Sequence, residues 1–310
     1  MKKRLLVGIG LLIVLGIAAV FLEPTKTLLG RLRGEQFVHG RPTTYWQQRL
    51  ISDDPAAQES ARKALRDGGA QSVGVLVEML QSKRADWSNV EVRWTASEIL
   101  GQIGAPAGDA GPALLAALKD SDAHVRNVAA TALGAIKPPA GDVVPALVEM
   151  LRTDDRLIAI KALTHYGAEA KAAVPALTEL LKDRNADVRW NAADALGLIG
   201  SAAASAVPLL AEGLKDEDAA VREHAAEALG LIGSTSETVI ASLAEALKDK
   251  DARVRRDAVR SLGQFGPAAK AALPAIKPLL RDVSDRVRTA AATAVHRIDP
   301  EGASGTQTSK

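Results

Sequence analysis

Apolar residues recur along this chain at the spacing of an α-helix. Between residues 219 and 232 they recur at helical spacing, which argues for one face of an amphipathic helix rather than a strand. They are Val221, Ala225, Ala228, Leu229 and Ile232. Gly233 then ends the helix, and a second apolar group at 239–247 predicts another helix after a polar turn. The unit is a helical hairpin.

Copies of this hairpin occur upstream and downstream. A valine–arginine pair marks the first helix and recurs at one constant interval within two series, whose pairs begin at Val92 and Val125 and at Val188, Val221, Val254 and Val287. A fixed period of about 33 residues is typical of stacked repeats, in which each unit buries its apolar face against its neighbours. We therefore predict an all-α protein, an α-solenoid of about seven helical hairpins plus capping helices.

Prolines locate the second helix of several units. Proline is tolerated in the first turn of a helix, where the amide has no partner within the helix, but it breaks a helix interior. The prolines in question are Pro112, Pro145, Pro175, Pro208 and Pro274. We expect the second helices to start there.

An aspartate precedes the repeat arginine by six positions in five units. In the turn between hairpins, this side chain can accept hydrogen bonds from the first amides of the next helix and can receive an arginine fork. The pairs are Asp120 and Arg126, Asp183 and Arg189, Asp216 and Arg222, Asp249 and Arg255, and Asp282 and Arg288.

The resulting pattern, D-x-x-x-x-V-R-x-x-A-x-x-A-L-G-x-I-G, resembles the HEAT-repeat family. It is most similar to the subtype named after phycobilisome lyases, and the whole chain resembles a membrane-anchored, bacterial-type member. The resemblance covers about residues 52–298. It implies a right-handed superhelix in which the aspartates and arginines form a hydrogen-bonded ladder from repeat to repeat.

The unit that begins near Asp154 departs from the pattern. The interval from Ala132 to Ala162 is shorter than the regular period, and Asp155 takes the place of the usual valine. Thr153 stands near the position of the junction aspartate. We predict that the ladder is broken at this point.

Charge and composition exclude several kinds of partner and site. The formal net charge is +2, and three positive charges lie in the tail 1–4, so the remainder carries −1. A protein that binds nucleic acid needs a dominant basic face, so no nucleic acid is expected. Cysteine is absent, which excludes disulfides, thiol catalysis and cysteine-bound metal.

Enzymatic relatives with this repeat suggest two chemistries to test. The subtype that the chain resembles includes iron-dependent hydroxylases, whose metal ligands come from His-Glu dipeptides. In this sequence, none of the five histidines is followed by glutamate. We therefore expect no catalytic residues, no metal and no cofactor, and no small-molecule substrate. The alternative is a lyase-like or regulatory subunit of an enzyme system, as in bilin lyases, but likeness of fold does not carry an activity.

The N-terminal region predicts attachment to a membrane. Residues 5–22 are an uncharged apolar run, about 27 Å long as a helix, which is just enough to cross a bilayer core. We expect a retained single-pass transmembrane anchor with the N-terminus inside and the solenoid outside, and the alternative is a cleaved signal peptide and a secreted protein. Residues 23–43 then form a linker, 44–298 the solenoid and 299–310 a disordered tail.

A possible partner-binding position follows the repeat arginine. It lies about 200° from the core valine on a helical wheel and so points away from the hairpin interior. Its larger apolar occupants are Trp94, Leu157 and Trp190. Exposed tryptophans suit protein association, and in the alternative interpretation each ring folds over its neighbours. The favoured function is a non-enzymatic scaffold for an unidentified protein partner.

Overall fold

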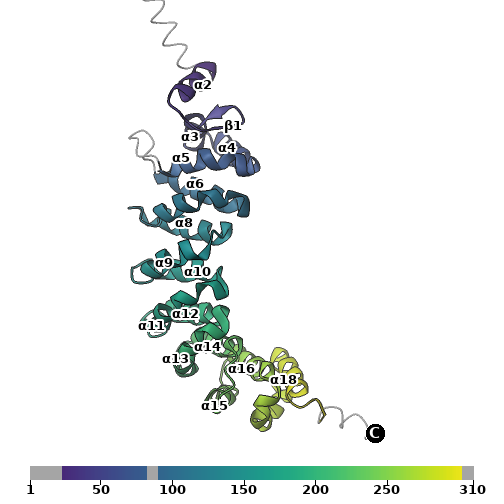
Figure 1. Ribbon diagram of the computed structural model, residues 1–310. Coiled ribbons are helices and arrows are strands. Elements are labelled where there is room, and N and C mark those ends of the chain that lie inside the picture. Colours follow the sequence, from purple (N-terminus) through teal and green to yellow (C-terminus); the bar gives the residue numbers. More distant parts are fainter. Residues whose placement is uncertain (1–22, 82–89, 302–310) are drawn as a thin grey trace, which may run out of the picture. The chain divides into compact units, whose positions relative to one another are not determined.

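The computed structural model describes residues 23–81 and 90–301, and this part of the chain is nearly all helical (Figure 1). The predicted membrane anchor at 5–22 and most of the predicted tail lie outside these residues. The chain divides into two compact units, Met1–Pro138 and Pro139–Lys310. Each unit is a stack of helical hairpins, so the structure has the predicted repeat architecture.

The first unit contains an N-terminal cap and the first hairpins. The cap comprises α2 (Glu23–Leu32), β1 (Phe37–Val38), β2 (Arg41–Pro42) and α3 (Thr43–Leu50). The hairpins are made of α4 (Pro55–Asp67), η1 (Gly69–Ser72), α5 (Val73–Gln81), α6 (Val90–Ile103), η2 (Ala105–Ala110), α7 (Gly111–Ala117) and α8 (Ala123–Ile136), where η denotes a 3₁₀ helix.

The segment expected to be a linker, residues 23–43, is folded. After α2 it forms a small antiparallel hairpin, in which Phe37 pairs with Pro42. Trp46 donates its indole N–H to the carbonyl of Val38, and the amide of Gln36 donates to the carboxylate of Glu78 on α5. The segment is therefore helix α2 followed by a β-hairpin, and together they cap the first end of the repeat array.

The second unit continues the repeats. Its elements are α9 (Ala140–Met150), α10 (Arg156–Thr164), η3 (Gly167–Ala173), α11 (Val174–Leu180), α12 (Ala186–Ile199), η4 (Gly200–Ala206), α13 (Val207–Gly213), α14 (Ala219–Ile232), α15 (Glu237–Ala246), α16 (Ala252–Gln264), η5 (Gly266–Ala272), α17 (Leu273–Ile276), η6 (Lys277–Arg281) and α18 (Asp285–Ile298). The first helices pack side by side in the order α10, α12, α14, α16 and α18. Equivalent leucines, Leu196, Leu229 and Leu262, are completely buried between the layers.

The prolines mark helix starts in four of the five cases. Pro112, Pro175, Pro208 and Pro274 lie in the first turn of α7, α11, α13 and α17, each directly after a 3₁₀ turn. Pro145 is the exception, because it lies inside α9, which already begins at Ala140. In that unit the residues equivalent to the 3₁₀ turn have joined the α-helix.

Among the residues that the structure describes, one helical run, 186–213, is long and apolar enough to span a membrane by length and composition. It comprises α12, η4 and α13, and Gly200 at its bend has a φ of +75°. Nearly half of its most apolar window is buried inside the protein. The run is therefore a repeat hairpin whose apolar character comes from its place in the core.

Glycines set the distance between successive first helices. A Cβ added at Gly263 of α16 would lie 2.9 Å from the Cβ and 3.0 Å from the Cα of Ala294 on α18. Gly197 of α12 has the equivalent relation to Ala228 on α14, because a Cβ added at Gly197 would lie 3.0 Å from the Cα of Ala228. These helices touch through their backbones, which explains the glycine of the A-L-G motif.

We predict that Gly263→Ala destabilises the protein by about 1 kcal/mol or more, because the added methyl group must push α16 and α18 apart. Gly141→Ala is the matched control, since Gly141 lies within α9 and has open space around its position. There the higher helix propensity of alanine should leave stability unchanged or raised. Urea unfolding of both variants measures the difference, and equal stabilities would contradict close helix packing.

The irregular unit should open more easily than its neighbours. Helix α10 has nine residues where α12 has 14, and its first residue is preceded by Asp155, whose side chain makes no capping hydrogen bond. We predict faster amide hydrogen exchange around residues 150–160 than in α12 and α14. Exchange measured by mass spectrometry tests this, and equal protection in the three regions would show the prediction to be wrong.

Candidate functional site

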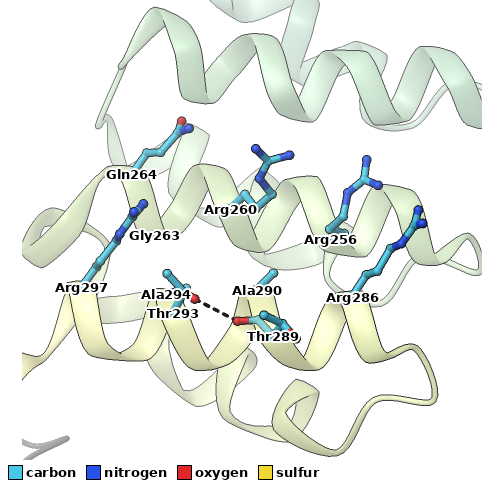
Figure 2. Close-up of a pocket in the computed structure, with 10 residues that line it drawn as sticks. All are labelled: Arg256, Arg260, Gly263, Gln264, Arg286, Thr289, Ala290, Thr293, Ala294 and Arg297. Carbon is cyan, nitrogen blue, oxygen red and sulfur yellow. Dashed lines mark hydrogen bonds between the residues drawn. The ribbon is translucent and has the colours of Figure 1, made fainter.

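An arginine-rich groove lies between α16 and α18 (Figure 2). Its volume is about 630 Å³. Helix α16 contributes Arg256, Arg260, Gly263 and Gln264, and helix α18 contributes Arg286, Thr289, Ala290, Thr293, Ala294 and Arg297. We call this the arginine groove. Gly263 and Ala294, where the backbones of the two helices approach closely, form its floor.

The four arginines of the groove differ in how far they are neutralised. Arg256 donates to both carboxylate oxygens of Asp257 and to Glu223 on α14. Arg260 makes one hydrogen bond of 3.2 Å to Asp257, and its side chain is 55% exposed. Within residues 23–81 and 90–301, the structure gives no hydrogen bond or ion pair to the side chains of Arg286 and Arg297. These two exposed guanidinium groups are available to a ligand.

Sequence reasoning missed this groove. The net charge of the whole chain is nearly zero, because positive and negative residues almost cancel. This total does not reveal the local excess of arginines on the two adjacent helices α16 and α18. The signal was present as basic residues at helical spacing in the last units. Arg297 follows Gln264 by one repeat period, so the two lie at equivalent positions of neighbouring repeats.

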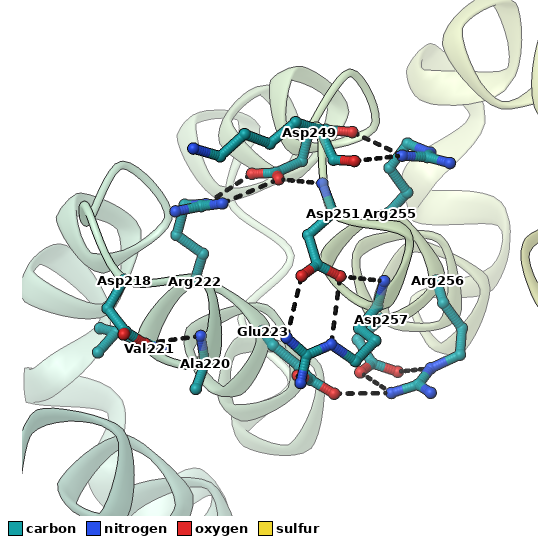
Figure 3. A network of polar contacts seen from close by, with 12 residues as sticks. Asp218, Ala220, Val221, Arg222, Glu223, Asp249, Asp251, Arg255, Arg256 and Asp257 are labelled. Carbon is teal, nitrogen blue, oxygen red and sulfur yellow. Dashed lines mark hydrogen bonds and ion pairs between the residues drawn. The ribbon is translucent and has the colours of Figure 1, made fainter. Parts of the chain in front are cut away.

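The helices beside the groove are joined by the ladder of arginines and aspartates (Figure 3). Arg222 of α14 binds the carboxylate of Asp249 through two hydrogen bonds, of 2.7 Å from Nε and 3.1 Å from Nη2. The same fork joins Arg93 to Asp120, Arg189 to Asp216 and Arg255 to Asp282, while Arg156 makes one hydrogen bond of 2.9 Å to Asp183. Each arginine therefore reaches forward by 27 residues, into the turn before the next hairpin.

The predicted pairing over six positions uses a different acceptor. Nη1 of Arg222 donates to the backbone carbonyl of Asp216, at 2.8 Å, and not to its carboxylate. Arg126, Arg189, Arg255 and Arg288 contact the backbone carbonyls of Asp120, Asp183, Asp249 and Asp282 in the same way. The expected fork between these partners is corrected to a carbonyl contact, because the carboxylate turns toward the preceding repeat.

Capping of the next helix falls to a different residue from the one expected. The carboxylate of Asp249 accepts from the amide of Asp251, at 2.8 Å. Asp251 in turn caps α16 by accepting from the amide of Arg253. At this junction the aspartate thus fixes the turn, and the residue two positions later caps the helix.

Two ladder arginines were hidden by the six-position spacing. Arg93 and Arg156 have carboxylate partners although no aspartate precedes them at that spacing. In the irregular unit, Thr153 stands where other units have the junction aspartate, and its hydroxyl donates to the carbonyl of Met150. A threonine cannot accept a bidentate fork, so this unit lacks a junction carboxylate at that position, although its own Arg156 keeps Asp183 as a partner.

The ladder changes the acidity of its members. Burial by itself raises the pKa of Asp249, but the hydrogen bonds from Arg222 and from the Asp251 amide lower it, and the net pKa lies below the usual value. The pKa values of Asp120, Asp216 and Asp282 are lowered by equivalent partners. The Arg222 guanidinium has a raised pKa because it donates to Asp249. Both partners thus remain charged, although Arg222 is only 6% exposed.

The predicted partner-binding residues are half-buried. In the first unit, Trp94 makes an edge contact with His124, with ring centroids 5.2 Å apart, and Arg62 lies over its face. In the second unit, Trp190 stacks on His224 at 4.9 Å. Leu157 is also half-buried. Each indole therefore contacts a histidine on the first helix of the next repeat. That histidine already covers part of the ring surface that a protein partner would need.

Three side chains could together hold a metal ion. They are Asp194 on α12 and His224 and Glu227 on α14, whose ligand atoms lie within 4.8 Å of one another. Nδ1 of His224 is inaccessible to solvent, has no hydrogen-bond partner among the described residues and lies 3.9 Å from each carboxylate. These three residues form no His-Glu dipeptide in the sequence. Asp194 and Glu227 occupy equivalent positions of two successive repeats, and only the packing of α12 against α14 brings them together.

Comparison with known proteins agrees with this architecture. A family model described as HEAT repeats matches residues 84–158, 154–219 and 207–296. No curated protein sequence matches the chain. The crystal structure of YibA from Escherichia coli is 24% identical, with a TM-score of 0.59, over 83% of this chain and 92% of that one. Importin beta is 17% identical, with a TM-score of 0.57, over 88% of this chain and 41% of its own. These likenesses show the fold alone.

We predict that Arg222→Ala lowers the free energy of unfolding by about 1 to 3 kcal/mol near neutral pH, because Asp249 loses its fork in a partly buried turn. Arg253→Ala is the control, since the side chain of Arg253 is 53% exposed; it should cost less than about 0.5 kcal/mol. Urea unfolding of both variants measures this difference.

The same variant should change the dependence of stability on pH. A carboxylate with a lowered native pKa stabilises the fold above its unfolded value of about 3.9, and this contribution is lost as pH falls through the native pKa. Stability of the parent should therefore drop below about pH 4, and the drop should be smaller in Arg222→Ala. If the parent and the variant lost stability equally at low pH, the hydrogen bonds from Arg222 to Asp249 would not contribute to stability.

Proposed function

The chain belongs to the HEAT-repeat family, and we propose that it is a non-enzymatic scaffold that binds a protein partner at a membrane. The observation that carries this proposal is the arginine groove, which offers two exposed guanidinium groups beside a floor of small side chains. Charged forks next to small apolar residues suit the recognition of a polypeptide.

The chemistry of the groove favours binding over catalysis. Guanidinium groups stay protonated and cannot take up a proton as a general base. The hydroxyls of Thr289 and Thr293 both donate to backbone carbonyls of α18, at 3.0 Å. The groove therefore supplies charge and shape, and none of its lining side chains forms a nucleophile–base pair.

The location at a membrane rests on the apolar run 5–22, which lies outside the described residues. As a retained anchor it would hold the repeat array on the side opposite the basic N-terminal tail. Folding of residues 23–43 would place this array close to the bilayer, because little free chain is left between anchor and cap.

Site-directed photocrosslinking in washed membranes tests the proposal. A photoreactive phenylalanine analogue is placed in the full-length protein at Thr293 in the groove, and at Leu280 on η6 as a second exposed position. We expect a protein adduct of discrete mass, and we expect the protein to stay with the membranes after a high-salt wash.

Two results would overturn this function. One is the lack of a protein adduct at these positions and at further exposed positions on both helix layers. The other is a purified protein that carries a bilin and transfers it, which would support the lyase-like alternative. A mature N-terminus near residue 19 in a protein without membrane association would remove the anchor only.

A further inference from the structure

We propose that the arginine groove binds a short, extended, acidic segment of the partner protein, with carboxylates taken by Arg286 and Arg297. This inference rests on the proposed scaffold function and adds the chemistry of the partner. The first observation is that Arg286 and Arg297 of α18 have no partner among the described side chains. The second is that the exposed guanidinium of Arg260 lies between them.

The spacing of the arginines limits the ligand. Arg286 lies beside Arg256 at one end of the groove, and Arg297 lies beside Gln264 at the other (Figure 2). The helix between Arg286 and Arg297 rises by about 16 Å along α18. An extended chain advances about 3.3 Å per residue. Two carboxylates about five residues apart would therefore reach both ends.

The floor of the groove determines which ligand residues fit between these two carboxylates. Ala290, Ala294 and Gly263 are small, and none of them has a polar side-chain atom. The threonine hydroxyl hydrogens are used within α18, so they do not compete for ligand acceptors. The middle of the segment should hence carry small or apolar side chains, which can lie flat on this floor.

Charges beside the groove favour a short acidic peptide over a nucleic acid. Glu223, on the neighbouring α14, binds Arg256 and Arg253, and Glu227 lies one turn further along the same helix. A polyanion that continued past the groove would meet these carboxylates and would be repelled. Nucleic-acid binding draws its affinity from many successive phosphates, and the groove provides room for few.

Peptide binding to the full-length protein in detergent tests this inference. The probe is a short fluorescein-labelled peptide with two aspartate pairs, separated by the span of the groove and with alanines between them, and fluorescence polarisation reports binding. The double variant Arg286→Glu, Arg297→Glu should weaken binding by about tenfold or more, because two charge-assisted contacts are lost. Both side chains are exposed, so the variant should fold, and circular dichroism checks this.

A control variant separates the groove from general charge. Arg184→Glu, Arg281→Glu makes the same change in net charge at exposed positions outside the groove, and it should alter affinity by less than about twofold. A peptide of the same composition with its aspartates contiguous should bind more weakly than the spaced one.

The inference fails if both double variants lose affinity equally, or if the peptide does not bind. It also fails if a labelled single-stranded RNA or phosphatidylserine vesicles bind through Arg286 and Arg297 more tightly than the peptide does. In each of these cases, a protein adduct formed by crosslinking at positions outside the groove would still support the scaffold function.

Discussion

At a regular junction, one carboxylate holds two repeats in register. Asp249 receives the fork of Arg222 from the preceding hairpin, fixes the amide of Asp251, and offers its own carbonyl to Arg255 of the following helix. Because Arg222 is almost completely buried, its charge requires this partner. The helices of consecutive units can then differ in almost every outward-facing residue without losing their relative position.

The repeats of this protein differ from one another mainly in the side chains on their outward face. The residue after the ladder arginine is a tryptophan in α12, a glutamate in α14 and an arginine in α16. These give, in turn, a ring stacked on His224, a carboxylate that joins two arginines, and one wall of the arginine groove. Small residues at the backbone contacts, such as Gly263 with Ala294, keep the floor between such side chains narrow.

The repeat architecture could be predicted from the sequence because it depends on local signals that recur. Helix starts at Ala186, Ala219 and Ala252 follow from apolar period and capping residues. The partners of the ladder could not be chosen by spacing alone, since a turn lets Asp216 face either Arg189 or Arg222, and packing decides. The same limit hid the groove and the group of Asp194, His224 and Glu227, which form only when adjacent helices bring together residues of different repeats. Likewise, the hairpin at 37–42 is too short to show strand alternation.

The forward reach of the ladder arginines also controls how such an array can change in length. If one whole repeat period between Arg189 and Asp249 were lost, Asp249 would take the place of Asp216, and Arg189 would again find a carboxylate at the correct distance. A deletion of any other length would leave a buried guanidinium facing a turn without an acceptor. Whole units can therefore be gained or lost by recombination without renewed selection at the junctions.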